Sequence, residues 1–384
     1  MRSRLILTLC LLLYGCGRST AVSPPPPLTA PAHLPTGPAA APQRLWEAAV
    51  GAGLAAPAML AAGRVIAASE TAVIAFDPQT GAEAWRVAPP GGVWPRALAA
   101  DDARVYVGTP GGLLALHAAD GSAAWQQATT GEVLWPPLAD GELVIAGTAH
   151  VGPGIEPDPA GRAWVVAWDA ETGALRWEVE TAVYTLVTPA AAGDLVVAGG
   201  SYAGTAAVDE GGHMRLHALG RQDGRARWTA ETTDGFLKSL AVDANGVYYL
   251  AYTDRLVALD AGSGAARWQY PTENWSPGFA YADGALYLGS DNAFVHAVDA
   301  ESGVAQWRVP LSGVFNSPRG RPAVGQHRVY FQGNDNGLYA LDRATGQLVW
   351  QTAPQPRSRV AVAVEDGRLY LAGQDGTLYA YGVP

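Results

Sequence analysis

Two acidic and amide pairs, Asp291-Asn292 and Asp335-Asn336, carry oxygen atoms that could bind a hard cation such as calcium. A calcium site needs several such oxygens converging on one point. Both pairs follow short apolar runs, where Asp and Asn are the ordinary residues of a turn. The pattern therefore favours turns over a metal site.

Other catalytic patterns are weaker. His213 and His217 are four residues apart, but a strand separates residues at that interval by about 13 Å. The chain has no G-x-S-x-G and no P-loop sequence, and the stretch 51–56 lacks the third glycine of a dinucleotide-binding loop. A formal net charge of −10 argues against nucleic acid as a partner.

The N-terminal segment predicts export. Arg2 and Arg4 precede an apolar run over 5–14, which is about half as long as the ~20 residues of a membrane-spanning helix. This combination is typical of a signal peptide that is removed from the mature chain. Loss of the two arginines would take the formal net charge from −10 to −12.

The residues Leu13-Tyr14-Gly15-Cys16 resemble the bacterial lipobox, which implies cleavage after residue 15 and lipidation of Cys16. An ordinary signal peptide cleaved a little later is the alternative. The other cysteine, Cys10, lies inside the removed segment, so the exported chain would form no disulfide. Residues 16–43 are rich in proline, which predicts a stiff, extended tether. Gly17, rather than Asp, follows the cysteine, which resembles outer-membrane sorting.

An eleven-residue phrase of the form A-x-D-x-x-T-G-x-x-x-W repeats along the rest of the chain. Its seven copies occupy residues 75–85, 115–125, 167–177, 218–228, 258–268, 297–307 and 340–350. The period is about forty residues, and about fifty in two units, which indicates radial or stacked repeats. Each unit contains short alternating runs separated by turn residues, which predicts four strands and one propeller blade.

An eighth phrase begins at Ala380-Tyr381 and has no tryptophan after it. Trp46 has no phrase before it, yet it lies 39 residues before Trp85, one period away. Joined, the two ends make one complete blade, with an N-terminal strand at its outer edge. We therefore expect one all-β domain over 44–384, an eight-bladed propeller closed by its own N-terminus.

The repeated tryptophans are expected to be structural, packing between neighbouring blades, with a turn glycine at positive φ. They are Trp46, Trp85, Trp125, Trp177, Trp228, Trp268, Trp307 and Trp350. The phrase resembles the tryptophan-docking motif of the quinoprotein-type eight-bladed propellers. That family contains pyrroloquinoline quinone (PQQ) dehydrogenases, which hold calcium and often an adjacent-cysteine disulfide, and also the outer-membrane assembly lipoprotein BamB, which has no quinone.

The candidate binding residues lie just before the innermost strands, on the face where the loops after the outer strands and between the second and third strands emerge. Aromatic and basic side chains are typical of binding hot spots; plugging of the channel mouth by the rings is the alternative. Two insertions, at 148–162 and 201–212, lie on the same face. The candidates are Trp94, Trp135, Tyr184, Phe236, Trp275 and Phe315, with Arg96, Lys238, Arg319 and Arg321 and, nearby, Arg357 and Arg359.

The sequence thus predicts a lipid-anchored, non-enzymatic propeller that acts as a protein-interaction scaffold in the cell envelope. The resemblance implies a BamB-like role in outer-membrane protein assembly, docking on a barrel-assembly protein, without a cofactor. In an envelope with two membranes, it implies the outer membrane facing the periplasm, with membrane contact only through the lipid. A ligand-binding or sensing envelope lipoprotein and a PQQ-dependent dehydrogenase are the alternatives.

Overall fold

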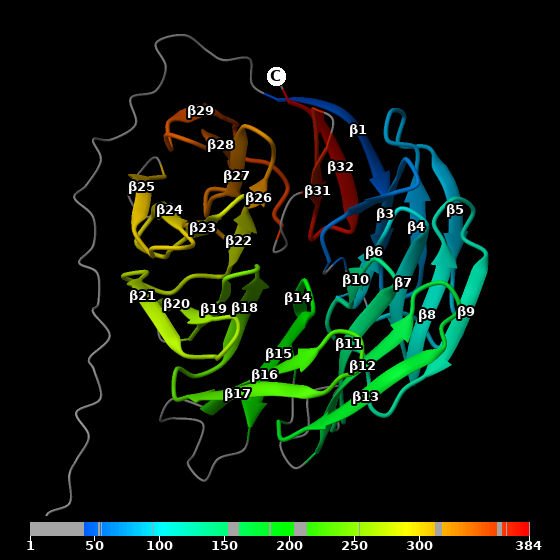
Figure 1. Ribbon diagram of the computed structural model, residues 1–384. Coiled ribbons are helices and arrows are strands. Elements are labelled where there is room, and N and C mark those ends of the chain that lie inside the picture. The colour runs from blue at the N-terminus through cyan, green and yellow to red at the C-terminus, as the bar shows by residue number, and fades with distance from the viewer. Residues whose placement is uncertain are drawn as a thin grey trace, which may run out of the picture.

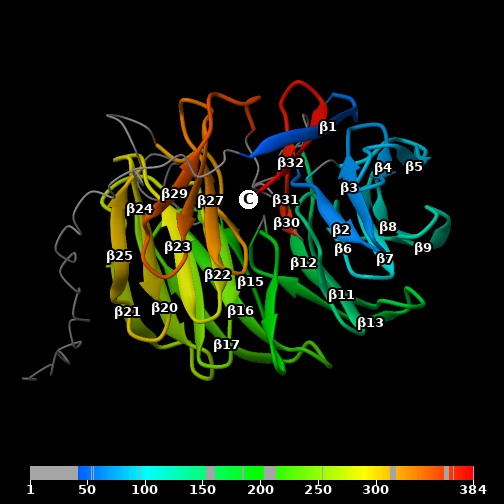
Figure 2. The same cartoon turned by 90° about the horizontal axis from the view of Figure 1, so that it is seen from above.

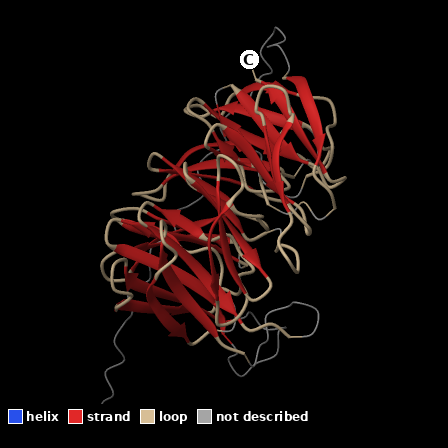
Figure 3. Cartoon of the chain, turned by 90° about the vertical axis from the view of Figure 1, so that its right-hand side faces the viewer, coloured by secondary structure: helices blue, strands red, loops and turns tan. Residues whose placement is uncertain are grey.

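The computed structural model describes residues 42–383 apart from 53, 55, 95, 153–160, 184–185, 203–212, 253, 312–316, 359–362 and 366. The predicted signal peptide, Cys16 and nearly all of the predicted tether lie outside the described residues. Every regular element in the described part is a β-strand, as Figure 3 shows. No helix in that part is long and apolar enough to cross a membrane.

In the described residues, 32 strands form eight four-stranded antiparallel sheets, which confirms the predicted blades. Blades one to four comprise β2 (Met59–Ala61), β3 (Arg64–Ala68), β4 (Val73–Phe76), β5 (Glu83–Val87); β6 (Leu98–Ala100), β7 (Arg104–Thr109), β8 (Gly112–His117), β9 (Ala123–Ala128); β10 (Leu138–Asp140), β11 (Leu143–Ala149), β12 (Ala163–Asp169), β13 (Leu175–Thr181); and β14 (Ala190–Ala192), β15 (Leu195–Tyr202), β16 (His213–Gly220), β17 (Ala226–Thr232).

Blades five to eight comprise β18 (Leu237–Val242), β19 (Gly246–Ala251), β20 (Arg255–Asp260), β21 (Ala266–Pro271); β22 (Phe279–Ala282), β23 (Ala285–Gly289), β24 (Phe294–Asp299), β25 (Ala305–Pro310); β26 (Ala323–Val324), β27 (Arg328–Gln332), β28 (Leu338–Asp342), β29 (Leu348–Gln351); and β30 (Ala363–Glu365), β31 (Arg368–Ala372), β32 (Thr377–Gly382) with β1 (Gln43–Ala49).

The sheets stand around a common centre, and in blades one to seven the chain enters each sheet at its innermost strand (Figure 1). The eighth sheet has the order β1-β32-β31-β30, so the N-terminal strand forms its outer edge. β1 pairs antiparallel with β32 from Gln43 opposite Gly382 to Ala49 opposite Thr377. Figure 2 shows the two strands side by side again. The predicted closure of the ring is confirmed: β1 pairs with β32 and completes the C-terminal blade as its fourth strand.

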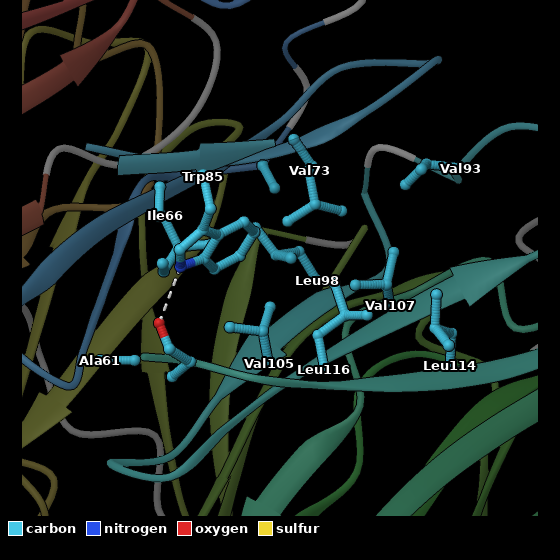
Figure 4. Packing of buried hydrophobic residues seen from close by; sticks show 14 residues of the cluster. Ala61, Ile66, Val73, Trp85, Val93, Leu98, Val105, Val107, Leu114 and Leu116 are labelled. Carbon is cyan, nitrogen blue, oxygen red and sulfur yellow. Dashed lines mark hydrogen bonds between the residues drawn. The ribbon is translucent and has the colours of Figure 1, made fainter. Parts of the chain in front are cut away.

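Burial explains why the middle strands are almost continuously apolar while the outer strands alternate. All seven residues of β11 are buried, because both faces of a middle strand pack against neighbouring blades. In β5 only Trp85 is buried. Its ring packs with Ile66 of its own blade and with Leu98 and Val105 of the next blade, as Figure 4 shows.

The Trp85 ring shows how the docking phrase works. Its Nε1 donates to the carbonyl oxygen of Ala118 in blade two at 3.0 Å, the bond drawn in Figure 4. Gly121 belongs to the same repeated phrase as Ala118 and lies in its turn. It packs directly against the Trp85 ring, because a Cβ at this position would lie 2.8 Å from a ring atom. Gly121 also has a φ of +74°, as the turn requires. The glycine therefore serves the turn and gives room for the ring.

Seven of the eight tryptophans donate in this way to the residue that follows the Asp position of the next blade's phrase. The pairs are Trp46–Pro78, Trp85–Ala118, Trp125–Ala170, Trp177–Arg221, Trp228–Ala261, Trp268–Ala300 and Trp307–Arg343. Each bond crosses a blade boundary, so the phrase of one blade holds the tryptophan of the blade before it. All these rings are buried except Trp228, which is half-buried.

The Trp350 ring is the exception. It is buried, but its Nε1 has no hydrogen-bond partner among the described residues. By the same rule, the acceptor would be the carbonyl oxygen of Val383 in blade eight. In that blade the third strand, β32, and the fourth strand, β1, are not joined by a turn, because they come from the two ends of the chain. The described residues of this blade contain no docking turn that would orient the carbonyl group. An unpaired buried donor typically costs about 1–3 kcal/mol, so closing the ring with the two chain ends has a local cost.

Candidate functional site

One rim of the propeller, which we call the loop face, carries the loops that follow the outer strands and those between second and third strands. Hydrogen bonds join the two kinds of loop: Val50 N donates to Gly376 O at 2.9 Å, and Asp291 N donates to Trp275 O at 2.8 Å. The docking turns lie on the opposite rim, the turn face. Both predicted insertions belong to the loop face, since they connect β11 to β12 and β15 to β16, but residues 153–160 and 203–212 lie outside the described residues.

On blades two and three, the loop-face aromatic residues are partly committed to packing. Trp94 is half-buried, and its Nε1 donates to Glu132 Oε2 at 2.9 Å. The same carboxylate accepts Gly111 N at 3.0 Å, which ties the two blades together. Trp135 is also half-buried, and the exposed Arg96 guanidinium lies over its ring at 5.6 Å from the centroid. Arg96 is the exposed side chain of this group, and it lies over a half-buried ring.

On blades five and six, Lys238 brings two loops together. Its Nζ lies 4.9 Å from the ring centroid of Tyr252 and 4.7 Å from that of Trp275. It also donates to Ser276 O at 3.2 Å. Such contacts with ring faces favour a cation. Burial nevertheless lowers the pKa of the Lys238 ammonium to about 8, while Asp254 and Asp291 act in the opposite direction.

The two arginine candidates that precede blade seven, Arg319 and Arg321, make different contacts. Arg321 reaches from the loop before blade seven to blade five, where its Nη2 donates to Lys238 O at 2.8 Å. Gly278 gives it room, since a Cβ there would lie 2.7 Å from Arg321 Cγ. Arg319 stays within blade seven, donating through Nη2 to Asn334 O at 3.4 Å. Arg321 therefore belongs with Lys238, and Arg319 does not.

The structure thus brings Lys238, Trp275 and Arg321 together, with Phe236 next to them on the chain, and separates them from Arg96 and Trp135. Tyr184, Phe315 and Arg359 lie outside the described residues. The sequence analysis missed Tyr252 and Asp254. Both lie between the second and third strands of blade five, whereas the sequence-predicted candidates lie at or just before the innermost strands.

The two acid–amide pairs are largely occupied by turns. Asp335 Oδ1 accepts Gly337 N at 2.9 Å, and its Oδ2 accepts the hydroxyl of Tyr339. Asn292 Oδ1 accepts Phe294 N at 3.1 Å. Among the residues that the structure describes, no three His, Cys, Asp or Glu side chains converge as a metal ligand set would. The described oxygens of Asp335 and Asn292 therefore serve their own turns.

Comparisons with known proteins identify the family to which the sequence of this chain is similar. The chain matches the family model described as outer membrane protein assembly factor BamB over residues 69–213, 162–274 and 271–383. A relative of that name from Shewanella oneidensis is 24% identical over 375 residues, covering 89% of this chain and 89% of the relative. Among solved structures, BamB from Moraxella catarrhalis has a TM-score of 0.65 at 21% identity, covering 89% of this chain and 100% of that one.

A quinohemoprotein alcohol dehydrogenase from Pseudomonas putida has a TM-score of 0.66 at 14% identity, covering 89% of this chain and 76% of that one. Its score is about the same as that of the Moraxella protein, although the two proteins carry different names. At these identities the likeness to either structure concerns the fold alone, and a fold does not name a function.

Proposed function

We infer the function from one premise: the chain belongs to the outer membrane protein assembly factor BamB family. We propose that it is a non-enzymatic scaffold of the cell envelope that binds proteins of the outer-membrane assembly machinery. The observation that carries the proposal is the family match, which runs through 69–383. The commitment of Asp335 and Asn292 to turns supports a scaffold over the quinone enzyme.

The protein contact is proposed on the loop face of blades two to four. Arg96 is exposed there over the Trp135 ring, and both insertions emerge on this rim. Loops held on a rigid scaffold are the usual place for binding. A guanidinium on an aromatic ring combines the two side-chain types that dominate binding hot spots.

Charge reversal at one arginine on each rim tests this placement. Arg96→Glu should reduce capture of envelope proteins from detergent extracts at least about fivefold, since loss of a hot-spot contact costs ~1 kcal/mol or more. Arg225→Glu is the matched control, because Arg225 is an exposed arginine in a docking turn of the turn face. The captured proteins are quantified by mass spectrometry. Equal capture by both variants would rule out this contact.

We also propose that the mature chain is anchored through a lipid on Cys16. β1 begins at Gln43 opposite Gly382, at the turn face, whereas its other end, Ala49, leads into the loop face. An extended tether of residues 17–42 would span up to about 80 Å at 3.1 Å per residue. Attachment at the turn face leaves the loop face open to partners.

The anchor has a direct test in the substitution Cys16→Ser. The variant should be recovered as uncleaved precursor or as released protein, because only a thiol accepts the lipid of a lipobox. The wild-type chain should yield an N-terminal peptide starting at modified Cys16 in mass spectrometry. A free N-terminus at any other residue of the wild-type chain would contradict the proposal.

A further inference from the structure

Lys238 is the only lysine in the chain; the other 24 of the 25 Lys and Arg residues are arginine. It lies on β18, the innermost strand of blade five, where the register shifts between Leu237 and Ser239. No other pairing of a first with a second strand in the described blades shows such a shift. A β-bulge changes the direction of the side chain that it carries. Here that side chain is Lys238, the one side-chain amine in the sequence.

The surroundings of Lys238 are built to hold it. Arg321 satisfies the Lys238 carbonyl oxygen at 2.8 Å, so the bulge leaves no orphan acceptor. The two loops that carry Tyr252 and Trp275 are tied together, since Thr272 donates from both N and Oγ1 to Asp254 O, at 2.9 and 2.8 Å. The arrangement is therefore fixed before any ligand arrives.

Exposed aromatic rings concentrate at this place. Tyr252 is 60% exposed, Phe236 39% and Trp275 37%, and these are the only exposed aromatic side chains in the described part of the chain. Two nearby residues without glycine's freedom also have positive φ, Asp254 at 58° and Glu273 at 64°. Such conformations cost on the order of 1 kcal/mol and cluster at functional sites. The rings and the strain together indicate a recognition surface.

The polar groups define the ligand. Lys238 and Arg321 balance the formal charges of Asp254 and Asp291, so the site has no net charge to attract an acidic or a basic partner. Asp254 Oδ1 accepts no hydrogen bond from any described residue, but it is buried and so does not face a ligand. The Lys238 ammonium has three N–H donors and uses one on Ser276 O.

We propose that the platform formed by Phe236, Lys238, Tyr252 and Trp275 binds a neutral oligosaccharide. The C–H face of a pyranose ring is weakly positive and flat, and it matches the negative face of an exposed aromatic ring. The hydroxyl groups of a sugar can accept from the N–H groups of the Lys238 ammonium that Ser276 O does not use. A peptide segment is the alternative occupant, and the test below separates the two. This site is additional to the protein contact proposed on blades two to four.

The single lysine makes the test specific. Full chain labelled with ¹³C at lysine Cε should give one side-chain resonance, that of Lys238. Titration with tetra-N-acetylchitotetraose, and separately with maltotetraose, should shift this resonance to saturation with at least one of the two sugars. Trp275→Ala should weaken the response at least about tenfold, because half of the platform is lost. Val304→Ala, an exposed apolar residue in a docking turn, should leave it unchanged.

Two results would overturn the inference: no saturable shift with either sugar, or an equal response in the Trp275→Ala variant when its melting temperature is unchanged. A shift caused only by added polypeptide would also overturn it, in favour of a peptide site. The measurement uses purified chain without envelope proteins, so it does not depend on the proposed scaffold function. Arg96→Glu should bind the sugar like the wild type even where it loses envelope proteins.

Discussion

Removal of residues 1–52 is expected to destabilise the propeller far more than removal of residues 1–42. The longer deletion takes away β1, and with it the hydrogen bonds to β32 from Gln43 to Ala49. It also removes Trp46, which is buried against Phe76 of blade one and Tyr370 of blade eight. Since truncating one buried tryptophan costs about 3–5 kcal/mol, the loss of the strand should exceed that value.

The comparison is made by urea unfolding, followed by far-ultraviolet circular dichroism. The 1–42 deletion is the control, because it ends just before β1 and leaves the ring closed. Trp46→Ala in the full chain should fall between the two deletions, since it keeps the strand but loses the ring and its bond to Pro78 O. Equal unfolding midpoints for the two deletions would show that β1 does not hold the ring together.

The closure of the ring by the N-terminal strand could be predicted from the sequence, because it follows from the number and spacing of the repeated phrases and tryptophans. Trp46 stands one period before Trp85, and a phrase without a tryptophan stands at Ala380-Tyr381, so the two fragments complement each other. The orphan Nε1 of Trp350 could not be predicted in this way. The hydrogen bond of each ring depends on the position of a carbonyl group in the next blade. The repeated phrase predicts that a tryptophan is present but does not predict its hydrogen-bond acceptor.

The candidate site shows the same division. The sequence indicated Lys238, Trp275 and Arg321 because they lie at or just before the innermost strands of successive blades. It gave no sign of Tyr252 or Asp254, because a loop between middle strands has no repeated signal of its own. Their approach to Lys238 arises from the bulge in β18 and from the bonds of Thr272 between loops. Both are tertiary events without a local pattern.

The second large effect is expected at the glycine of a docking turn. Gly303 has a φ of +71°, and a Cβ there would lie 2.5 Å from the Trp268 ring. The ring cannot retreat, because it is buried and its Nε1 is bonded to Ala300 O at 3.1 Å. Gly303→Ala should therefore destabilise blade six against blade five by about 3 kcal/mol or more, through backbone strain and overpacking together.

Gly284 separates these two causes. It lies in the same blade with a φ of +76°, but a Cβ there would meet no atom within 4 Å. Gly284→Ala should thus cost only the left-handed backbone strain, on the order of 1–2 kcal/mol. The difference between the two alanine variants in urea unfolding measures the clash with the ring.

A double-mutant cycle tests whether the glycine and the ring act as one unit. Trp268→Ala alone should cost about 3–5 kcal/mol, because it empties a buried position between two blades. In the double variant the new methyl group of Gly303→Ala meets no ring, so the combined loss should be smaller than the sum of the single losses by 1 kcal/mol or more. If the two losses of unfolding free energy were strictly additive, Gly303 would be needed only for its turn, and the packing of the Trp268 ring would not depend on it.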